Sequence, residues 1–293
     1  MTPKGTTRVA CVLGHPVAHS RSPALHNAAY AAIGLDAIYV ALDVAPGRVE
    51  GAVHGLAALG FMGANVTVPH KEAALKACPW VDQVAQQANA VNTIVVEGGD
   101  IRGYNTDVPG LARALREEAP QLAGGAAVVL GGGGAARAAI LAARELGFEV
   151  VAVVRRPEAA GALRALDCKV VPWTSAAIEP LFTHARLVID ATSMGMSREA
   201  EAHAPSSLPV ERLPESAVVS SLVYHRKPAL LELARQRGLT ALDGGGMLVH
   251  QAALAFELMT GRPAPIEAMR RAFADAALLG SSDSIPENAD APR

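Results

Sequence analysis

The chain has 293 residues, which is long enough for two domains of ordinary size. Hydrophobic residues make up 51% of it but aromatic residues only 4%, so we expect a core of alanine, valine and leucine. The net charge of −2 gives no support for a surface that binds nucleic acid or an anionic membrane. No uncharged run of about eighteen apolar residues occurs, so a membrane-spanning helix is not expected either.

The cysteines and the N-terminus bear on the cellular compartment. Cys11, Cys78 and Cys168 are scattered, odd in number and without the spacing of a metal site, so we expect free thiols and no bound metal. Unpaired thiols are typical of the reducing cytosol. Residues 1–8 are short and polar, which is unlike a signal peptide. The sequence therefore predicts a cytoplasmic protein.

The first part of the chain alternates apolar strands with helices. We expect strands at residues 9–13, 37–42, 61–68 and 91–96, and helices at residues 24–32, 48–59 and 81–90. Residues 97–100 have the sequence Glu-Gly-Gly-Asp, which is typical of a hairpin turn. This alternation predicts an α/β domain.

Two serines stand in the polar loop after the first strand. Ser22 precedes Pro23 at the start of the next helix, so we expect it to cap that helix. One interpretation is that Ser20 and Ser22 serve only as cap and turn residues. The alternative is that their paired hydroxyls point into a cleft and bind a polyol or a carboxylate.

Lys71 and Asp107 each stand where the chain passes into a helix. Pro69 ends the third strand, so Thr67 and Lys71 lie at its carboxyl end, where ligands bind in open α/β sheets. Asp107 precedes a helix expected at residues 111–118, and capping that helix is the commoner role for such an aspartate. The residues alone do not separate these functional and structural interpretations.

The second part of the chain follows a junction at residues 120–125 and opens with a short apolar strand at 126–130. Gly131, Gly133 and Ala136 then fit the pattern G-x-G-x-x-A. One glycine permits a sharp turn, the next lets the backbone approach a pyrophosphate, and the small residue lets helix pack on strand. Four glycines could also form a merely flexible loop, but a following helix and a strand at residues 149–154 favour a dinucleotide site.

Two arginines follow that strand. An NAD-selective unit usually places Asp or Glu there to bind the ribose 2′-hydroxyl, and a carboxylate would repel a 2′-phosphate. Arg155 would attract the phosphate, so it predicts NADP rather than NAD. Arg156 either reinforces the phosphate site or is simply solvated.

The remaining elements complete this second unit. We expect a strand that runs into a loop within residues 187–196, a strand at residues 218–224, and helices at residues 229–238 and 247–259. Residues 198–214 are rich in Pro, Ser, Glu and His, which predicts a surface loop. Residues 281–293 are rich in Ser, Asp and Pro, which predicts a disordered tail.

Six segments resemble motifs of the shikimate dehydrogenase family, in the family's own order. They are residues 14–23 (G-N-P-x-x-H-S-x-S-P in the family), 65–71 (N-V-T-x-P-x-K), 90–93 (A-V-N-T), 104–110 (x-N-T-D-x-x-G), 131–138 (G-x-G-G-A-x-R-A) and 244–252 (G-x-x-M-L-x-x-Q-A). The resemblance implies reversible reduction of 3-dehydroshikimate to shikimate by NADPH, a step in chorismate and aromatic amino-acid biosynthesis. It also implies an α/β substrate domain at residues 1–109, completed by helices at 247–280, and a Rossmann NADP-binding domain at 110–246.

The resemblance also assigns roles to single residues. Lys71 and Asp107 would be the catalytic pair. The substrate would contact Ser20, Ser22, Thr67, Asn92, Asp107, Tyr224 and Gln251. The cofactor would contact Gly131, Gly132, Gly133, Gly134, Ala135, Arg155, Arg156, Thr192, Leu222, Gly244 and Met247.

The proposed pair makes chemical sense. Hydride delivered to a carbonyl carbon leaves an alkoxide, so a positioned acid must supply a proton. An ammonium group beside a carboxylate can donate it and offset the developing charge. Sequence does not decide which partner moves the proton, and we favour Lys71 with Asp107 orienting it. A core ion pair without chemistry is the alternative.

The chain departs from the family pattern at several places. Asp190 replaces the asparagine of N-A-T-x-x-G-M, and Ser221 and His225 replace the aspartate and asparagine of D-L-V-Y-N-P, which removes a buried carboxylate. Where the family often has Asn-Arg-Thr, Arg155 aligns with the arginine, but Val154 and Arg156 differ from the residues on either side of it. Three alternatives therefore stay open: a paralogue acting on quinate or an aminoshikimate-like analogue, an inactive nucleotide-binding regulatory module, and another Rossmann dehydrogenase such as a methylene-folate enzyme. We expect a monomer or a homodimer.

Overall fold

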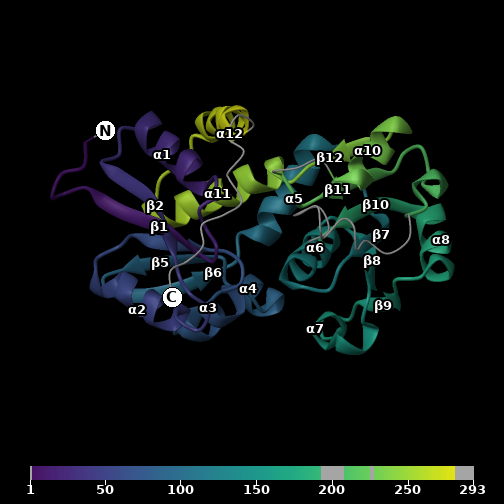
Figure 1. Cartoon of the computed structure of the whole chain (residues 1–293), viewed down its shortest axis with the longest axis horizontal. Coiled ribbons are helices and arrows are strands. Elements are labelled where there is room, and N and C mark those ends of the chain that lie inside the picture. The colour runs from purple at the N-terminus through teal and green to yellow at the C-terminus, as the bar shows by residue number, and fades with distance from the viewer. Residues whose placement is uncertain (1, 193–207, 225–227, 281–293) are drawn as a thin grey trace, which may run out of the picture.

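A computed structural model describes residues 2–192, 208–224 and 228–280 of the chain. These residues form two sheets of six strands each, with helices on both faces (Figure 1). The α/β fold class is confirmed. The tail expected at residues 281–293, and most of the loop expected at 198–214, lie outside the described residues.

The first sheet is mixed and has the strand order β2-β1-β3-β5-β6-β4. Its strands are β1 (Arg8–Gly14), β2 (Ala37–Asp43), β3 (Gly63–Val66), β4 (Trp80–Val81), β5 (Thr93–Glu97) and β6 (Asp100–Tyr104). Between them run α1 (Ser22–Ala32), α2 (Val49–Ala58), α3 (Lys71–Ala77) and α4 (Gln83–Ala88). β1 pairs in parallel with β2 and β3, whereas β5 is antiparallel to β3 and β6.

The sequence of β1 shows how this sheet is buried. Alternate residues of a strand point to opposite faces. Ala10 and Val12 join a core under α1 and α11 (Gly245–Thr260), and Cys11 and Leu13 join a second core under α2 and α3. Because both faces are covered, the strand is one continuous apolar run without alternating polar residues.

The second sheet is entirely parallel and has the strand order β12-β11-β10-β7-β8-β9. Its strands are β7 (Gly125–Leu130), β8 (Phe148–Val154), β9 (Lys169–Pro172), β10 (Ala185–Asp190), β11 (Val218–Ser221) and β12 (Thr240–Leu242). Its helices are α6 (Gly134–Glu145), α7 (Gly161–Arg164), α8 (Ser175–His184) and α10 (Ala229–Gln236). This is the order of a doubly wound dinucleotide fold, with the switch point between β7 and β10.

Two helices connect the sheets. In Figure 1, α5 (Asp107–Glu118) and α11 lie between the left and right halves of the molecule and pack on each other. Gly110 of α5 permits this contact, because a Cβ there would lie 2.8 Å from the backbone nitrogen of Gln251 on α11. After α11 the chain returns to the first half, where α12 (Ile266–Gly280) packs on α1.

Local chemistry explains where some elements begin and end. The predicted hairpin is confirmed: β5 and β6 are joined through Gly98 and Gly99, both with positive φ. α4 is shorter than the helix expected at residues 81–90, because Asp82 caps its start and Asn89 ends it in the left-handed conformation. α5 is longer than expected at residues 111–118, because it already begins at Asp107.

Candidate active site

The centre of the candidate site is a lysine–aspartate pair at two helix starts. Lys71 is the first residue of α3 and Asp107 the first of α5, and Lys71 Nζ lies 2.6 Å from Asp107 Oδ2. Asn92 Nδ2 donates to the other carboxylate oxygen, Oδ1, at 2.8 Å. The side chain of Asp107 is 11% exposed and that of Lys71 is 28% exposed. The carboxylate is therefore fixed from two sides while the ammonium group remains accessible.

Asp107 does not cap its helix. Thr106 is the N-cap residue, and Asn105 Oδ1 accepts from the N–H groups of Asp107 and Val108 at 3.0 and 3.2 Å. Asn105 thus takes the donors that a capping aspartate would satisfy. The expectation that Asp107 commonly serves as a cap is wrong here, and its carboxylate is left for Lys71 and Asn92.

A chain of buried hydrogen bonds also fixes Asn92, which donates to Asp107. Its Oδ1 accepts from the backbone N–H of Thr106 at 2.7 Å. Its backbone carbonyl accepts from Asn65 Nδ2 at 3.2 Å, and Tyr39 donates its hydroxyl to Asn65 Oδ1 at 2.7 Å. Buried polar networks that satisfy every member fix side chains in one orientation. This network ties the pair to β2 and β3.

All the predicted substrate residues line one cavity of about 210 Å³ together with Lys71. Those residues are Ser20, Ser22, Thr67, Asn92, Asp107, Tyr224 and Gln251. They come from the loop between β1 and α1, from the start of α1, from just after β3, from just before β5, from the start of α5, from the segment after β11, and from α11. The structure therefore brings together residues that lie more than two hundred positions apart in the sequence.

The serines show a different local arrangement from the one expected. Ser22 is already the first residue of α1, and no side chain caps this helix at Arg21, so the predicted cap is wrong. Ser20 Oγ instead accepts from the N–H of Ser22 at 3.3 Å. Both serines border the cavity. Arg21 lies over the rings of Tyr224 and Phe273, at 5.5 and 5.1 Å, which anchors the loop between them.

A second cavity of about 680 Å³ lies against the glycine turn between β7 and α6. Gly131 has a φ of +115°, and a Cβ there would lie 3.0 Å from the carbonyl oxygen of Ala191. Gly133 is the N-cap of α6 and supplies no capping side chain. The first N–H groups of the helix therefore have no side-chain acceptor and can bind an anion. Arg155, at the end of β8, borders the same cavity.

The two cavities adjoin. Thr67, Ala135, Leu222 and Tyr224 border both of them. A molecule held on the glycine turn therefore lies next to the cavity that contains the lysine–aspartate pair. This is the geometry that hydride transfer between two bound molecules requires, because the reacting atoms must approach to about 3–3.5 Å.

Comparison with known proteins agrees with this geometry. Residues 12–94 match the family model for the shikimate dehydrogenase substrate binding domain, and residues 244–272 match that for the shikimate 5′-dehydrogenase C-terminal domain. A shikimate dehydrogenase (NADP(+)) of Methanopyrus kandleri is 43% identical over 282 residues, which cover 91% of this chain and 94% of the relative. The chain belongs to the shikimate dehydrogenase family.

Further relatives extend this result. One from Symbiobacterium thermophilum, named shikimate dehydrogenase (NADP(+)), is 42% identical over 292 residues, 95% of this chain and 97% of the relative. The crystal structure of the Thermus thermophilus shikimate 5-dehydrogenase in complex with NADP(H) and shikimate aligns with a TM-score of 0.81 at 38% identity. It covers 92% of this chain and 99% of that one. The shikimate dehydrogenase of Aquifex aeolicus aligns with a TM-score of 0.84 at 31% identity, over 92% and 99% of the two chains.

Most of the predicted cofactor residues of this shikimate dehydrogenase family member lie together. The larger cavity is bordered by Gly131, Gly132, Gly133, Gly134, Ala135, Arg155, Thr192 and Leu222. Gly244 and Met247 border the smaller cavity instead. Arg156 is exposed and borders neither cavity, which fits the interpretation of a solvated side chain.

Three contributors were missed from the sequence. Asn65 and Tyr39 support Asn92, and the motif that begins at Asn65 was the available signal for the first. Trp173 borders the larger cavity beside Arg155. It lies just after β9, and no sequence motif marks it.

Arg137, on α6, connects the glycine turn to the half of the molecule that carries Lys71. Its Nε donates to the carbonyl of Ala88 at 2.7 Å and its Nη2 to that of Asn89 at 3.3 Å. Nη2 also bonds Glu72 Oε1 on α3 at 2.5 Å. Only 5% of the Arg137 side chain is exposed, so its cationic head is held between the two halves.

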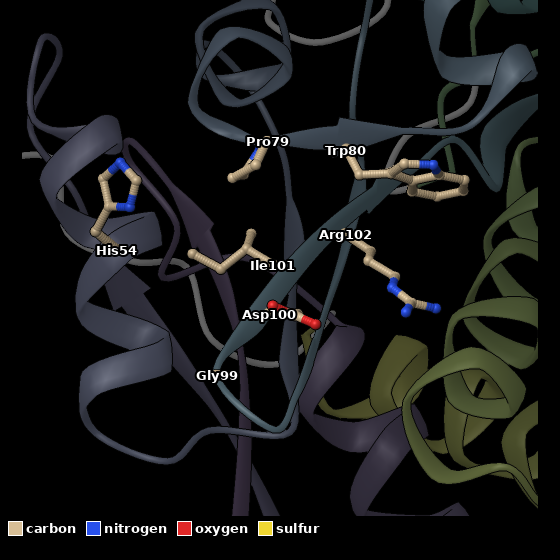
Figure 2. A pocket seen from close by; sticks show the side chains of 7 residues that line it. All are labelled: His54, Pro79, Trp80, Gly99, Asp100, Ile101 and Arg102. Carbon is tan, nitrogen blue, oxygen red and sulfur yellow. The ribbon is translucent and has the colours of Figure 1, made fainter.

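Another hollow, of about 630 Å³, lies beside the short edge strand β4. His54, Pro79, Trp80 and Arg102 are among its lining residues, and none of the predicted site residues belongs to it. Figure 2 shows Trp80 and Arg102 extending away from His54. Its polar groups do not converge on one point, unlike those around Lys71.

The remaining expectations on metals, thiols and membranes concern only the described residues. There, no group of His, Cys, Asp and Glu is arranged to hold a metal ion, and no helix is long and apolar enough to span a membrane. All three cysteines are buried and unpaired with each other. Burial raises the pKa of Cys11 to about 12, so this thiol is not a nucleophile at neutral pH.

Proposed function

We propose that this protein is an NADP-dependent shikimate dehydrogenase that interconverts 3-dehydroshikimate and shikimate in chorismate and aromatic amino-acid biosynthesis. The observation that carries the proposal is the pair of adjoining cavities. One holds an accessible ammonium group braced by a buried carboxylate, and the other holds a glycine turn at a helix start. Family membership and relatives named shikimate dehydrogenase (NADP(+)) support the same activity.

The residues around the larger cavity fit NADPH. Gly131 and Gly133 leave room for a pyrophosphate at the start of α6, and the N–H groups there favour an anion. Arg155 stands where a carboxylate would select NAD, and its guanidinium suits a 2′-phosphate. When bound there, NADPH supplies the hydride.

The residues of the smaller cavity bind the substrate and move the proton. Ser20 and Ser22 donate hydroxyls to the substrate carboxylate, and Thr67, Asn92, Asp107, Tyr224 and Gln251 hold its hydroxyls and the reacting oxygen. Lys71 Nζ donates the proton that the developing alkoxide requires. Asp107 accepts from Nζ at 2.6 Å, so it orients the ammonium group.

The two halves of the molecule support a division into two domains. We propose a substrate domain of residues 1–109 and 247–280 and an NADP-binding domain of residues 110–246. We also propose that the protein is cytoplasmic and works as a monomer or a homodimer. Small-angle scattering of the purified chain with and without NADPH tests the oligomeric part of this proposal.

The decisive assay measures oxidation of shikimate and of quinate, each with NADP and with NAD. We expect the shikimate–NADP pair to have the highest kcat/KM. A higher kcat/KM for quinate would instead identify a paralogue within the family. Absence of turnover with every pair would remove the proposed activity and favour an inactive nucleotide-binding protein.

A further inference from the structure

Two neighbouring strands of the second sheet end in a pair of buried polar residues. Asp190 closes β10 and Ser221 closes β11, and the two are direct register partners. Asp190 is 3% exposed and Ser221 is fully buried. Ser221 donates its hydroxyl to Asp190 Oδ2 at 3.4 Å. The carboxylate that the family places on β11 is thus not lost from this chain, because β10 carries one at the facing position.

The second oxygen of this carboxylate holds the segment after β10. Asp190 Oδ1 accepts from the N–H of Thr192 at 3.0 Å and from its hydroxyl at 2.6 Å. Burial raises the pKa of Asp190, and the hydrogen bonds from Thr192 and Ser221 oppose that rise. A buried carboxylate is retained only when its oxygens are bonded in this way.

The same residue also holds the segment after β11. Leu222 donates its N–H to the backbone carbonyl of Asp190 at 3.0 Å. Ser221 Oγ, bonded to the carboxylate, accepts from the N–H of Val223 at 3.4 Å. Thr192, Leu222 and Val223 all border the larger cavity. Two separate wall segments are therefore held by Asp190: Thr192 by its carboxylate, and residues 222–223 by its backbone carbonyl and through Ser221 Oγ.

We propose that Asp190 is a positioning residue for the cofactor cavity, and that its carboxylate replaces, from the adjacent strand, the one that the family carries at position 221. It fixes residues 191–192 and 222–223 against the glycine turn, where a Cβ at Gly131 would lie only 3.0 Å from the carbonyl oxygen of Ala191. Asp190 does not touch the substrate cavity. Thr192 and Val223 border only the larger cavity, whereas Leu222 borders both, so removal of the Asp190 side chain should weaken NADPH binding much more than substrate binding.

Exchanging the two residues gives the sharpest test. S221D alone places two carboxylates side by side in a buried site, where like charges cannot both ionise. D190N alone keeps an acceptor for Thr192. D190N/S221D restores the family arrangement, because the added amide can donate to the added carboxylate. The proposal predicts that the double variant binds NADPH more tightly than S221D.

The inference rests on the proposed function only for the identity of the ligand, so binding is measured apart from turnover. We would titrate NADPH fluorescence with the wild type, D190A, D190N, S221D and D190N/S221D, and measure KM for shikimate and kcat on the same samples. D190A should raise the Kd for NADPH by about tenfold, as expected for loss of hydrogen bonds to a charged group, with little change in KM for shikimate. S220A, on the same strand but the opposite face, is the matched control and should behave as the wild type.

Each result bears on one proposal. An unchanged Kd in D190A, or a double variant no better than S221D, overturns the role of Asp190 and leaves the proposed activity intact. A merely structural role would raise KM for shikimate and lower thermal stability in parallel with the Kd, which also overturns it. If D190A does not fold, the comparison of S221D with the double variant still decides. A wild type that binds NADPH but oxidises no substrate contradicts the proposed function instead.

Discussion

The two cavities adjoin, yet their walls are built from different groups. Around the substrate cavity, polar side chains bond to one another through Asn92, Asn65 and Tyr39. Around the larger cavity, which we propose binds the cofactor, the glycine turn presents backbone atoms rather than side chains. Asp190 does not line this cavity but holds the segments that do. Side-chain identity therefore decides what the first cavity recognises, whereas backbone conformation decides whether the second can form. Substitutions around the first cavity should therefore lower turnover, whereas substitutions around the second should weaken NADPH binding.

The largest effect is expected from K71A. Removal of the ammonium group leaves no proton donor beside the reacting oxygen, and loss of a general acid costs about a thousandfold in kcat. NADPH binding and thermal stability should persist, because Asn92 still bonds Asp107. Steady-state kinetics and NADPH titration check both parts. K76A, an exposed lysine on the same helix, is the control. Near-normal turnover in K71A would contradict its catalytic role.

The second prediction concerns the backbone of the other cavity. G131A forces a side chain into a position with φ of +115° and close to the Ala191 carbonyl, at a cost of roughly 1–3 kcal/mol. We expect the Kd for NADPH to rise about tenfold or more while the affinity for shikimate is unchanged. G161A is a suitable control, since a Cβ at that position meets nothing within 4 Å. If G131A bound NADPH normally, the glycine turn would not be the phosphate site.

A smaller effect separates the two arginines after β8. R155Q removes the cation that borders the cofactor cavity, so kcat/KM with NADP should fall about tenfold while that with NAD changes little. R156Q removes a charge that borders neither cavity and should change the NADP-to-NAD ratio less. The ratio of kcat/KM for the two cofactors in each variant is the measurement. Equal losses in both variants would show that Arg156 also binds the phosphate.

The smallest expected effect is a pH dependence of the free energy of unfolding. It arises from His26, which packs on Tyr39 behind the smaller cavity. His26 is fully buried and stacks on Tyr39 with ring centroids 4.2 Å apart. Burial lowers its pKa from 6.5 to about 3. Between these values the unfolded chain binds a proton that the folded chain excludes, so the free energy of unfolding falls as pH decreases.

H26F keeps an aromatic ring on Tyr39 and removes this titration. The acid slope of its unfolding free energy should be shallower than that of the wild type by up to about 1.4 kcal/mol per pH unit. Urea unfolding at several pH values between the two pKa values measures the slope. H184Q, at an exposed histidine, should keep the wild-type slope. Identical slopes in H26F and the wild type would show that His26 does not titrate on unfolding.

The sequence could predict local features that depend on nearby residues. Gly131 and Ala136 follow a strand at a fixed spacing, so the turn and its helix were predictable. The hairpin at Gly98 and Gly99 was predictable for the same reason. The start of α5 was not, because a capping aspartate and an aspartate one position inside the helix look alike in sequence. Only the bonds from Asn105 distinguish them.

Features that depend on how distant segments pair with each other could not be predicted from the sequence. Ser221 was interpreted as the loss of a buried carboxylate, and Asp190 as a separate substitution. That they face each other follows from the pairing of β10 with β11, which no local pattern encodes. The contact of Arg137 with Ala88 is of the same kind, since forty-nine positions separate the two residues.

The contacts of Arg137 add a third link between the two halves of the molecule. If α5 and α11 were the only links, the two halves could swing about them and every distance across the cleft would change together. Arg137 joins α6 to the carbonyls at the end of α4 and to Glu72, the neighbour of Lys71. The glycine turn at the start of α6 is therefore linked directly to the segment that carries Lys71, in addition to the link through α5 and α11.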